Sequence, residues 1–266
     1  MIPRLSGPVL VYSVVMTTEA DGKPAVAPHP PLSRYYEGPA QRRRWVRDLF
    51  DGSADDYEWI TRVMSFGSGA WYRREALKRA GVGPGMTVLD VCMGSGQVSR
   101  AARDLVGPHG VVLGLDASLG MLRAAAKLAP IPRTQGLVEQ LPVRSSSVDF
   151  VSMGYALRHA EDLAVTFREY LRVLRPGGGL LLLEFTRPRS RASYVFFRAY
   201  LNTVVPAIAR VRGSNAHTMM RYFWDTIETC VPPETILAAL AEAGFEAPSR
   251  FGQIELFGEY TASKPQ

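Results

Sequence analysis

VLDVCMGSGQ, residues 88–97, is the stretch that decides the fold. A short apolar run with an acid at Asp90 leads into a loop with glycines at positions 94 and 96, and residues 97–106 then follow a helical pattern. Glycine lets a backbone approach a ligand closely, and open parallel sheets bind ligands where strands end. The stretch therefore predicts a ligand site after the first strand of an α/β domain.

Strand and helix patterns alternate from this loop onward. Strands are predicted at 87–93, 111–117, 134–138, 148–157 and 180–186, and helices at 97–106, 118–129 and 161–174. Short connections between them favour a parallel sheet with helices on both faces. The continuous apolar run LLLLEF fits a strand buried on both sides. The last pattern, at 254–263, predicts an antiparallel strand at the edge of the sheet.

The two flanks of this pattern differ from it. Residues 1–39 predict a flexible extension, with a proline-rich run at 21–33 and an apolar run at 7–16. That apolar run is too short to cross a bilayer, and the alternative is the core of a signal peptide. The domain is expected over 40–266. Within it, 187–235 is helical up to Pro206 and predicts an insert that covers the acceptor site.

Composition narrows the partners. The net charge of +6 is spread out, with clusters at 42–44 and at Arg187, Arg189 and Arg191. These clusters indicate either a solvated surface or contact with an anionic membrane. The sequence has no basic stripe interleaved with aromatic residues, so nucleic acid binding is not predicted. Cys92 and Cys230 provide no disulfide framework, which suits a reducing cytoplasm, and no histidine spacing predicts a metal site.

The loop lacks the marks of two common ligands. A third glycine, expected for a dinucleotide, is absent, as is the Gly-Lys-Ser/Thr end of a triphosphate loop. A second acid, Asp116, ends the next strand, where a carboxylate accepts hydrogen bonds from ribose hydroxyls. Two acids and a glycine pair suit a cationic nucleoside, S-adenosylmethionine. Asp90 would face its positive end or order the loop; the alternative is that the glycines form only a turn and Asp116 only begins a helix.

Several segments resemble the ubiquinone/menaquinone biosynthesis C-methyltransferases, the UbiE/COQ5 family. They are YEWITRVMSFG (57–67), VLDVCMGSGQ (88–97), LGLDASLGML (113–122), LVEQLPVRSSSVDFVSMGYALRH (137–159), YLRVLRPGGGLLLLEF (170–185) and AEAGF (241–245). The resemblance implies a Rossmann-like class I methyltransferase with a mostly parallel sheet of seven strands. The cofactor residues it implies are Asp90, Met93, Gly94, Ser95, Gly96, Asp116, Ala117, Met121, Leu137, Val138 and Gly154. Departures from the family pattern at Gln97, 137–138, Gly154 and His159 leave the acceptor open.

Methyl transfer from a sulfonium is an in-line displacement in which orientation contributes most. Methylation at carbon also needs electron density on the ring, which loss of a neighbouring phenol proton supplies. His159 is the expected base by its ordinary pKa, Arg158 is expected to stabilise the phenolate, and Tyr57 to position the ring. The alternative for His159 is an exposed residue at the start of a helix.

Aromatic residues of the C-terminal insert predict the acceptor site. Tyr194, Phe197 and Leu201 recur at helical spacing and indicate either a path for a prenyl tail or a packed lid. Tyr222 and Trp224 are expected to stack on an aromatic ring, or to belong to the core. The substrate residues are thus Tyr222, Trp224 and Phe197.

The function expected is methylation at carbon of a prenylated quinol by an S-adenosylmethionine-dependent enzyme. Two alternatives stay open: a methyltransferase of secondary metabolism that acts on another aromatic or hydroxylated molecule, and a non-catalytic subunit of a biosynthetic complex. The protein is expected in the cytoplasm, with contact to the inner face of the membrane and a homodimer as further options.

Overall fold

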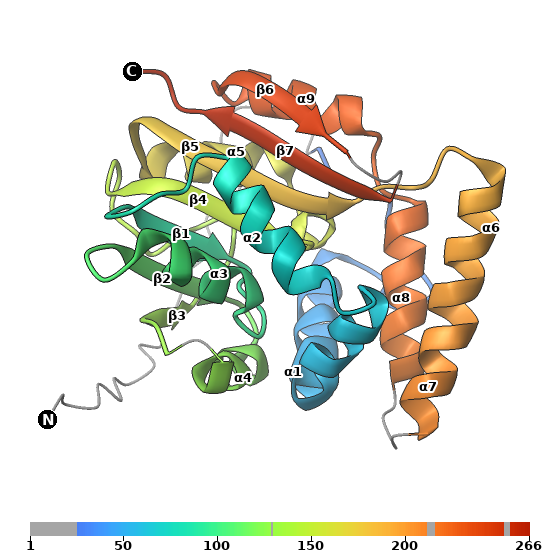
Figure 1. Ribbon diagram of the computed structural model, residues 1–266. Coiled ribbons are helices and arrows are strands. Elements are labelled where there is room, and N and C mark those ends of the chain that lie inside the picture. The colour runs from blue at the N-terminus through green and yellow to red at the C-terminus, as the bar shows by residue number, and fades with distance from the viewer. Residues whose placement is uncertain (1–25, 129, 212–215, 253–255) are drawn as a thin grey trace, which may run out of the picture.

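A mixed sheet of seven strands runs through the computed structural model, which describes residues 26–128, 130–211, 216–252 and 256–266 (Figure 1). The strands are β1 (Thr87–Val91), β2 (Val111–Asp116), β3 (Arg133–Gln135), β4 (Val148–Gly154), β5 (Leu174–Phe185), β6 (Glu246–Phe251) and β7 (Phe257–Ser263). Their order across the sheet is β3-β2-β1-β4-β5-β7-β6. The order reverses between β1 and β4, which places a ligand site beyond the carboxyl ends of these two strands.

The predicted fold class is confirmed, with one change at the edge of the sheet. Neighbouring strands from β3 to β5 are parallel, and β7 is antiparallel to β5 and to β6. The last strand, expected at the edge, lies instead between β5 and β6, and β6 forms the edge. β6 is exposed along almost its whole length and carries Pro248 and Arg250, which are typical of an edge strand. Its sequence therefore lacks the alternation of apolar and polar residues from which a strand could be predicted.

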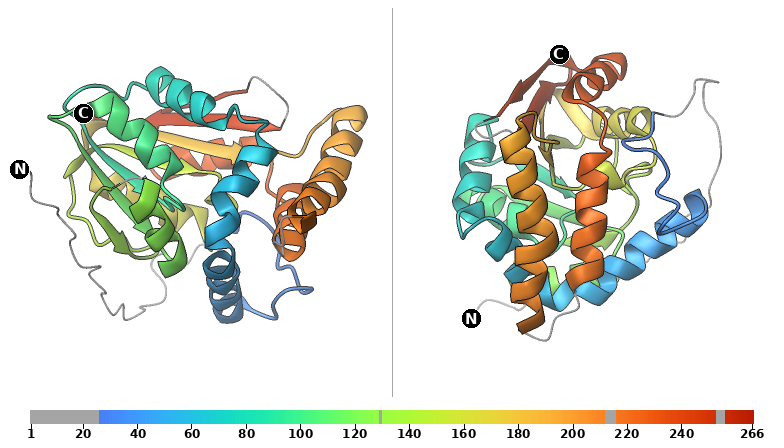
Figure 2. Two further views of the ribbon diagram at one scale, coloured as in Figure 1. Left: turned by 60° about the horizontal axis from the view of Figure 1, so that its bottom comes forward. Right: turned by 90° about the vertical axis from the view of Figure 1, so that its right-hand side faces the viewer.

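Helices cover both faces of the sheet (Figures 1 and 2). α2, α3 and α4 pack on one face, and α5 and α9 on the other. The helices are α1 (Pro39–Met64), α2 (Gly69–Arg79), α3 (Gln97–Val106), α4 (Leu119–Leu128), η1 (Leu157–His159), α5 (Leu163–Val173), α6 (Arg191–Ala199), η2 (Tyr200–Val204), α7 (Val205–Val211), α8 (Ala216–Glu228) and α9 (Pro233–Glu242). None of these is long and apolar enough to span a membrane.

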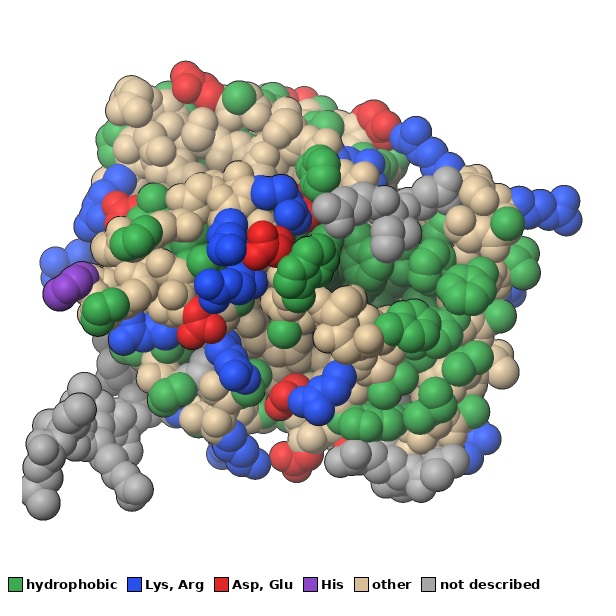
Figure 3. Space-filling view, in the orientation of Figure 1, with side chains coloured by type: hydrophobic (Ala, Val, Ile, Leu, Met, Phe, Trp, Pro, Cys, Tyr) green, Lys and Arg blue, Asp and Glu red, His purple; other side chains and the backbone are tan. Residues whose placement is uncertain are grey.

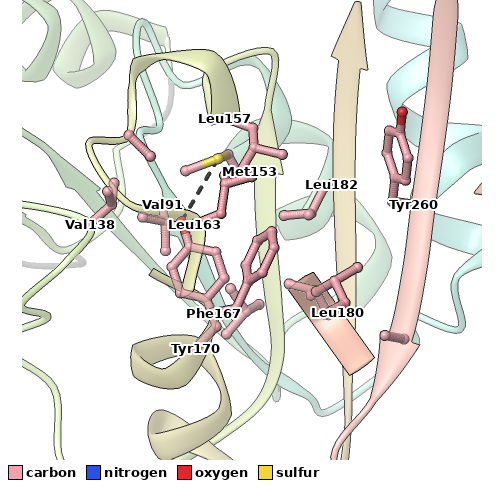
Figure 4. Packing of buried hydrophobic residues seen from close by; sticks show 14 of the residues in the cluster. Val91, Val138, Met153, Leu157, Leu163, Phe167, Tyr170, Leu180, Leu182 and Tyr260 are labelled. Carbon is pink, nitrogen blue, oxygen red and sulfur yellow. Dashed lines mark hydrogen bonds between the residues drawn. The ribbon is translucent and has the colours of Figure 1, made fainter. Parts of the chain in front are cut away.

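β5 shows why its four successive positions 180–183 are all apolar. Leu180 and Leu182 point toward α5, where they pack with Phe167 and Tyr170 (Figure 4), whereas Leu181 and Leu183 point toward α2 and α3. Each leucine is at most 1% exposed. Because full burial of a leucine contributes about 1.5–3 kcal/mol, this strand anchors both halves of the core.

The insert after β5 stands at the carboxyl end of the parallel strands, as the right-hand view of Figure 2 shows. The helix predicted to end at Pro206 continues through α6, η2 and α7 to Val211. Proline has no N–H for the carbonyl four residues before it, here that of Asn202. The chain accommodates this gap with a π-helical turn at Tyr200–Val204 instead of stopping.

The segment 26–38, which we call the strap, is packed rather than flexible. Backbone N–H groups of two other segments donate to the carbonyls of Val26 and Pro28 at 2.9 and 2.8 Å. The Tyr35 hydroxyl donates to Asp225 of α8 at 2.7 Å, and Tyr36 is buried. The expected extension 1–39 therefore contains a docked segment, while residues 1–25, with the apolar run at 7–16, lie outside the described residues.

Candidate active site

The loop after β1 takes backbone conformations that explain its glycines. Gly94 and Gly96 have φ of +54° and +87°, in the left-handed region that favours glycine, and Gly96 is the N-cap of α3. Cys92 shares this region, with φ of +52°. The Met93 N–H donates to the carbonyl of Leu115 in β2 at 2.9 Å. The loop is thus fixed against the neighbouring strand.

Asp116 holds the loop from the end of β2. Its Oδ2 accepts the Gly94 N–H and its Oδ1 accepts the Ser118 N–H, both at 2.8 Å. Burial raises the pKa of this carboxyl to about 6, against the opposing effect of these hydrogen bonds. Ser118 caps α4 as predicted, since its hydroxyl accepts the Met121 N–H at 3.0 Å. Each Asp116 oxygen keeps one more lone pair for a ligand hydroxyl.

Asp90 lies in the interior of the protein and connects β1 to α3 and β4. It is fully buried, and its carboxylate accepts the hydroxyls of Ser99 in α3 and of Ser152 in β4, the latter at 2.9 Å. Burial raises its pKa to about 6. Of the two roles expected for Asp90, the geometry supports the ordering role, because this carboxylate lines neither of the cavities described below.

The larger of two neighbouring cavities, about 500 Å³, lies against Asp116; we call it the cofactor cavity. It is bordered by these predicted residues: Gly94, Asp116, Ala117, Met121, Leu137, Val138 and Gly154. α1 forms another wall, with Phe50 among its residues. An acid for ribose hydroxyls, apolar side chains for a base and a glycine loop fit S-adenosylmethionine. Met93 and Ser95 border the second cavity instead, and Gly96 borders neither.

The second cavity, about 180 Å³, is mostly apolar; we call it the acceptor cavity. α8 contributes Met219, Met220 and Phe223, and the ends of β5 and β7 contribute Phe185 and Phe257. Methionine and aromatic side chains form an adaptable surface that suits a flat, apolar ligand. Figure 3 shows hydrophobic side chains around a hollow between the sheet and the helices of the insert.

Five residues border both cavities and form a shared wall: Tyr57, Cys92, Gly94, Gly154 and Tyr155. A Cβ on Gly94 would stand 3.8 Å from the Tyr57 ring, so this tyrosine lies directly over the loop. Tyr155 has φ of +61°, a conformation that is rare for a tyrosine. A group in one cavity can therefore meet a group in the other at Tyr57 and Tyr155.

None of the three residues predicted to bind substrate lines the acceptor cavity. Tyr222 packs against the strap and α1, where its ring lies 5.2 Å from that of Tyr35 and 4.8 Å from that of Trp45. Trp224 is buried against Tyr194, and Phe197 packs in the core of the insert. The residue between the two predicted ones, Phe223, faces the cavity instead, because neighbouring positions on a helix point in different directions.

Arg158 lies behind the site rather than in it. It is fully buried, its guanidinium pairs with Glu184, and its Nε donates to Thr226 at 3.0 Å. The guanidinium carbon also lies 4.2 Å from the centre of the Phe223 ring. Arg158 borders neither cavity, so this arrangement does not offer the direct contact with a phenolate that we expected.

His159 lines the cofactor cavity and is not the exposed residue of the alternative interpretation. Its Nδ1 lies 3.4 Å from the Tyr222 hydroxyl, and its Nε2 is buried without a hydrogen-bond partner in the described part of the chain. Burial, and then the positive charges of Arg158 and Arg42, hold its pKa well below the usual value. The imidazole is therefore neutral at pH 7.

Several site residues had no signal in the sequence. The basic cluster at 42–44, expected on a solvated or membrane-facing surface, borders the cofactor cavity. Within it, Arg42 is buried and donates to the carbonyls of Arg158 and Ala160. Only the helical periodicity of α1 hinted at this, because it required one face of the helix to be covered.

Comparison with known proteins agrees with this geometry. The model of the ubiE/COQ5 methyltransferase family matches residues 39–252. A demethylmenaquinone methyltransferase of Lactococcus lactis is 32% identical over 210 residues, covering 76% of this chain and 82% of the relative. A ubiquinone/menaquinone biosynthesis C-methyltransferase, UbiE, of Pseudomonas paraeruginosa is 31% identical over 214 residues, covering 78% and 83%.

Solved structures share the fold at lower identity. Phosphoethanolamine N-methyltransferase 2 of Haemonchus contortus, in complex with S-adenosyl-L-methionine, has a TM-score of 0.59 at 20% identity and covers 83% of this chain and 60% of its own. The [4+2]-cyclase SpnF has a TM-score of 0.60 at 17% identity, covering 84% and 96%. Since a protein named as a cyclase shares the fold, the fold alone does not determine the reaction.

Proposed function

Because this chain belongs to the ubiE/COQ5 methyltransferase family and is an S-adenosylmethionine-dependent methyltransferase, we propose that it methylates a ring carbon of a prenylated quinol. The observation that carries the proposal is the shared wall, at which an apolar cavity meets the cofactor cavity. A quinol ring fits between methionine and aromatic side chains, with the carbon to be methylated at Tyr57 and Tyr155.

The protein's own residues would supply orientation. When bound, S-adenosylmethionine supplies a methyl group on a positively charged sulphur. Asp116 would hold the ribose hydroxyls, and its bond to the Gly94 N–H fixes the position of this glycine at the shared wall. Tyr57 stands over that position and limits the approach of the acceptor ring. Holding two reactants in line provides most of the acceleration for a displacement of this kind.

Arg158 and His159 would have different roles in this arrangement. We assign Arg158 as a positioning residue, because Glu184 and Thr226 hold its guanidinium behind Phe223. His159 would accept the phenol proton through water, since its neutral form is the one present at pH 7. It borders the cofactor cavity only, so the water must reach across the shared wall.

His159→Asn tests the second assignment. We expect S-adenosylhomocysteine affinity to stay unchanged while turnover falls and its pH profile loses a limb. His217→Asn, on the exposed side of α8, is the control and should behave as the wild type. An H159N variant with the wild-type pH profile would remove His159 from proton transfer.

A matched pair of variants tests the acceptor cavity. Phe223→Leu removes an aromatic ring from the cavity wall, and we expect the KM for the acceptor to rise about tenfold, since aromatic pairing is worth about 0.5–1.5 kcal/mol beyond burial. Phe197→Leu makes the same change in the core of the insert and should leave KM unchanged. Equal KM values for the two variants would place the ring elsewhere.

We also propose that the insert rests on an anionic membrane surface. The residues named for this in the sequence face inward: Leu201 is buried, and Tyr194 and Phe197 pack against the core. The opposite side of α6 exposes Val195 and Phe196, at 56% and 55%. The Tyr200 ring stacks on Phe196 and on Phe66, at 6.2 and 4.9 Å between centroids, which extends the apolar surface toward the acceptor cavity.

Charge favours a lipid surface over a second copy of the chain. Arg187, Arg189, Arg191 and Arg198 are exposed at this end of the molecule, and anionic headgroups attract such residues at about 1 kcal/mol each. Sedimentation with vesicles that contain phosphatidylglycerol should deplete the protein, whereas Phe196→Asp should stay in solution. Unchanged sedimentation of F196D, or dimerisation that F196D abolishes, would contradict the membrane assignment.

The acceptor itself decides between the remaining functions. Purified protein is incubated with S-adenosylmethionine and a reduced demethylquinol, prenylated or not, and the products are analysed by mass. We expect one added methyl group on carbon and a preference for the prenylated quinol. Quinones extracted from a deletion strain should be lighter by one methyl group.

An unaltered quinone profile would favour a methyltransferase that acts on another aromatic or hydroxylated molecule. Binding of S-adenosylhomocysteine without transfer to any acceptor would favour a non-catalytic subunit.

A further inference from the structure

Arg73 is a buried cation without a partner. It lies in α2, is only 8% exposed, and lines the acceptor cavity. No hydrogen bond or ion pair joins its guanidinium to any residue in the described ranges; the guanidinium carbon lies 5.6 Å from the centre of the Tyr155 ring. A buried charge without an anion is costly, so such a group is expected to serve a ligand.

Two buried carboxylates beside this cavity already have arginine partners. Glu184 pairs with Arg158, and Glu259 pairs with Arg79 through two hydrogen bonds of 3.2 and 2.6 Å. Both carboxylates are buried, at 0% and 2% exposed. Each of these two acids is therefore matched by its own arginine, and Arg73 is the charged residue that lines the acceptor cavity.

Gly69 keeps the space in which this guanidinium lies. A Cβ on Gly69 would stand 2.6 Å from Nη1 of Arg73, closer than atoms approach one another without a bond. Gly69 is the first residue of α2 and its φ is not in the left-handed region, so the backbone there does not require glycine. A Cβ would also stand 2.9 Å from Oγ of Ser65, so a side chain at this position would displace Nη1 of Arg73, Ser65 or both.

We infer that Arg73 binds an anionic oxygen at the shared wall. On the proposed function, this oxygen is the ionised hydroxyl of the aromatic acceptor, beside the carbon that is methylated. The guanidinium lies against Tyr155, which borders both cavities, and its charge acts on Tyr57 and Tyr155, where it lowers the pKa of both hydroxyls against the larger effect of burial. Arg73 thus takes the place in which Arg158 was expected.

The acceptor and the cofactor together account for every bond that forms or breaks in this step. The hydroxyl proton leaves to water, and the electron pair of the ring carbon forms the new carbon–carbon bond as the methyl–sulphur bond breaks, with its electron pair retained by sulphur. The proton on that ring carbon then passes to water, and its bonding pair restores the aromatic ring and the negative charge on oxygen. Arg73 would stabilise that charge when the hydroxyl first ionises and again when it returns with this second proton loss.

The anionic oxygen that Arg73 binds could also belong to the carboxylate in the amino acid part of the cofactor. Gly94 and Ser95, which are expected to hold the cofactor, also border the acceptor cavity. Calorimetry separates the two sources. Arg73→Met is titrated with S-adenosylhomocysteine and with 5′-methylthioadenosine, which lacks the carboxylate. If Arg73 holds the acceptor oxygen, both affinities stay at the wild-type value. A loss of about 10- to 100-fold for S-adenosylhomocysteine alone would assign Arg73 to the cofactor carboxylate.

The acceptor arm uses 4-nitrophenol, whose absorbance reports its ionisation, in the presence of saturating S-adenosylhomocysteine. We expect the wild type to bind the phenolate about 10- to 100-fold more tightly than R73M does, with partial rescue by Arg73→Lys. Arg74→Met is the matched control, because Arg74 is the next residue on α2 but is exposed and outside the acceptor cavity. Gly69→Ala, which leaves Arg73 in the chain but displaces Nη1, should also weaken binding.

The results separate this inference from the proposed function. Two outcomes would show that the inference is wrong. In the first, R73M and R74M both bind the phenolate and S-adenosylhomocysteine as the wild type does. In the second, the wild type does not bind the phenolate and R73M retains its affinity for S-adenosylhomocysteine. Methylation of a prenylated quinol by the wild type would stand in either case. Conversely, phenolate binding that depends on Arg73, without transfer to any quinol, would leave the inference intact and remove the quinol.

Discussion

Replacement of Asp116 by Asn is expected to abolish most cofactor affinity while leaving the fold intact. The carboxylate accepts one backbone N–H on each oxygen, from Gly94 and from Ser118. An amide can accept only one of these, and its NH₂ group would face the other N–H. At most one of the two ribose hydroxyls would then keep a hydrogen-bond acceptor. This acceptor would be a neutral amide oxygen, which forms weaker hydrogen bonds than a charged carboxylate.

The expected loss follows from these contacts. Hydrogen bonds to charged groups contribute about 1.5–3 kcal/mol each, so losing one and weakening another amounts to about 3–4 kcal/mol. At about 1.4 kcal/mol for each factor of ten, the Kd for S-adenosylhomocysteine should rise about 100- to 1000-fold. Stability should change little, because the rise in the Asp116 pKa from 3.8 to about 6 means that the ionised carboxyl costs about 3 kcal/mol in the folded protein.

Isothermal titration calorimetry with S-adenosylhomocysteine, together with thermal unfolding, measures both quantities. Asp149→Asn is the control: Asp149 also accepts a backbone N–H, from Thr87, at the other end of β1, but it borders neither cavity. A Kd for D116N within about threefold of the D149N value would refute the assignment of Asp116 to the ribose.

Three further predictions concern the same framework. The affinity for S-adenosylhomocysteine should be constant above pH 7 and fall as the pH drops through about 6, by up to about tenfold per pH unit, because the raised pKa lets Asp116 protonate and lose acceptor capacity; a flat titration between pH 5 and 8 would contradict this. Glu184→Gln should destabilise the protein by about 3–5 kcal/mol in urea unfolding, since it leaves Arg158 as an unpaired buried charge. The exposed pair of Glu234 supplies the control: Glu234→Gln should change stability by less than about 1 kcal/mol, and equal effects of the two changes would be inconsistent with the burial argument. Gly94→Ala should cost about 1–2 kcal/mol because of its left-handed backbone, again in urea, and an unchanged midpoint would show that the loop relaxes freely.

The sheet was predictable because its strands carry local signals. LLLLEF and VLDV are apolar at all positions but one, and Gly96 and Ser118 mark the helices that follow. β6 carries no such signal, because an exposed edge strand needs no apolar face. The strap was also missed, since its proline-rich composition resembles a linker and its packing depends on Asp225, which lies about 190 residues farther along the chain.

The site was predictable where function depends on backbone geometry and less so where it depends on side-chain direction. Asp116 and Gly94 follow from strand ends and a turn. Whether Phe223 or its neighbours face the acceptor depends on how α8 is rotated against β5, which the spacing of aromatic residues alone does not determine. Arg73 had no local mark at all, because its lack of a partner becomes visible only after Arg158 and Arg79 have taken the two nearby acids.

The shared wall has a kinetic and stereochemical consequence. Cys92 places a thiol at that wall, and burial holds the pKa of this thiol well above the usual value, which disfavours the thiolate that an enzyme-bound methyl relay would need. On the proposed function we therefore expect direct transfer, with both ligands bound in one ternary complex. A chirally labelled methyl group would reach the product with inverted configuration, the mark of a single direct transfer.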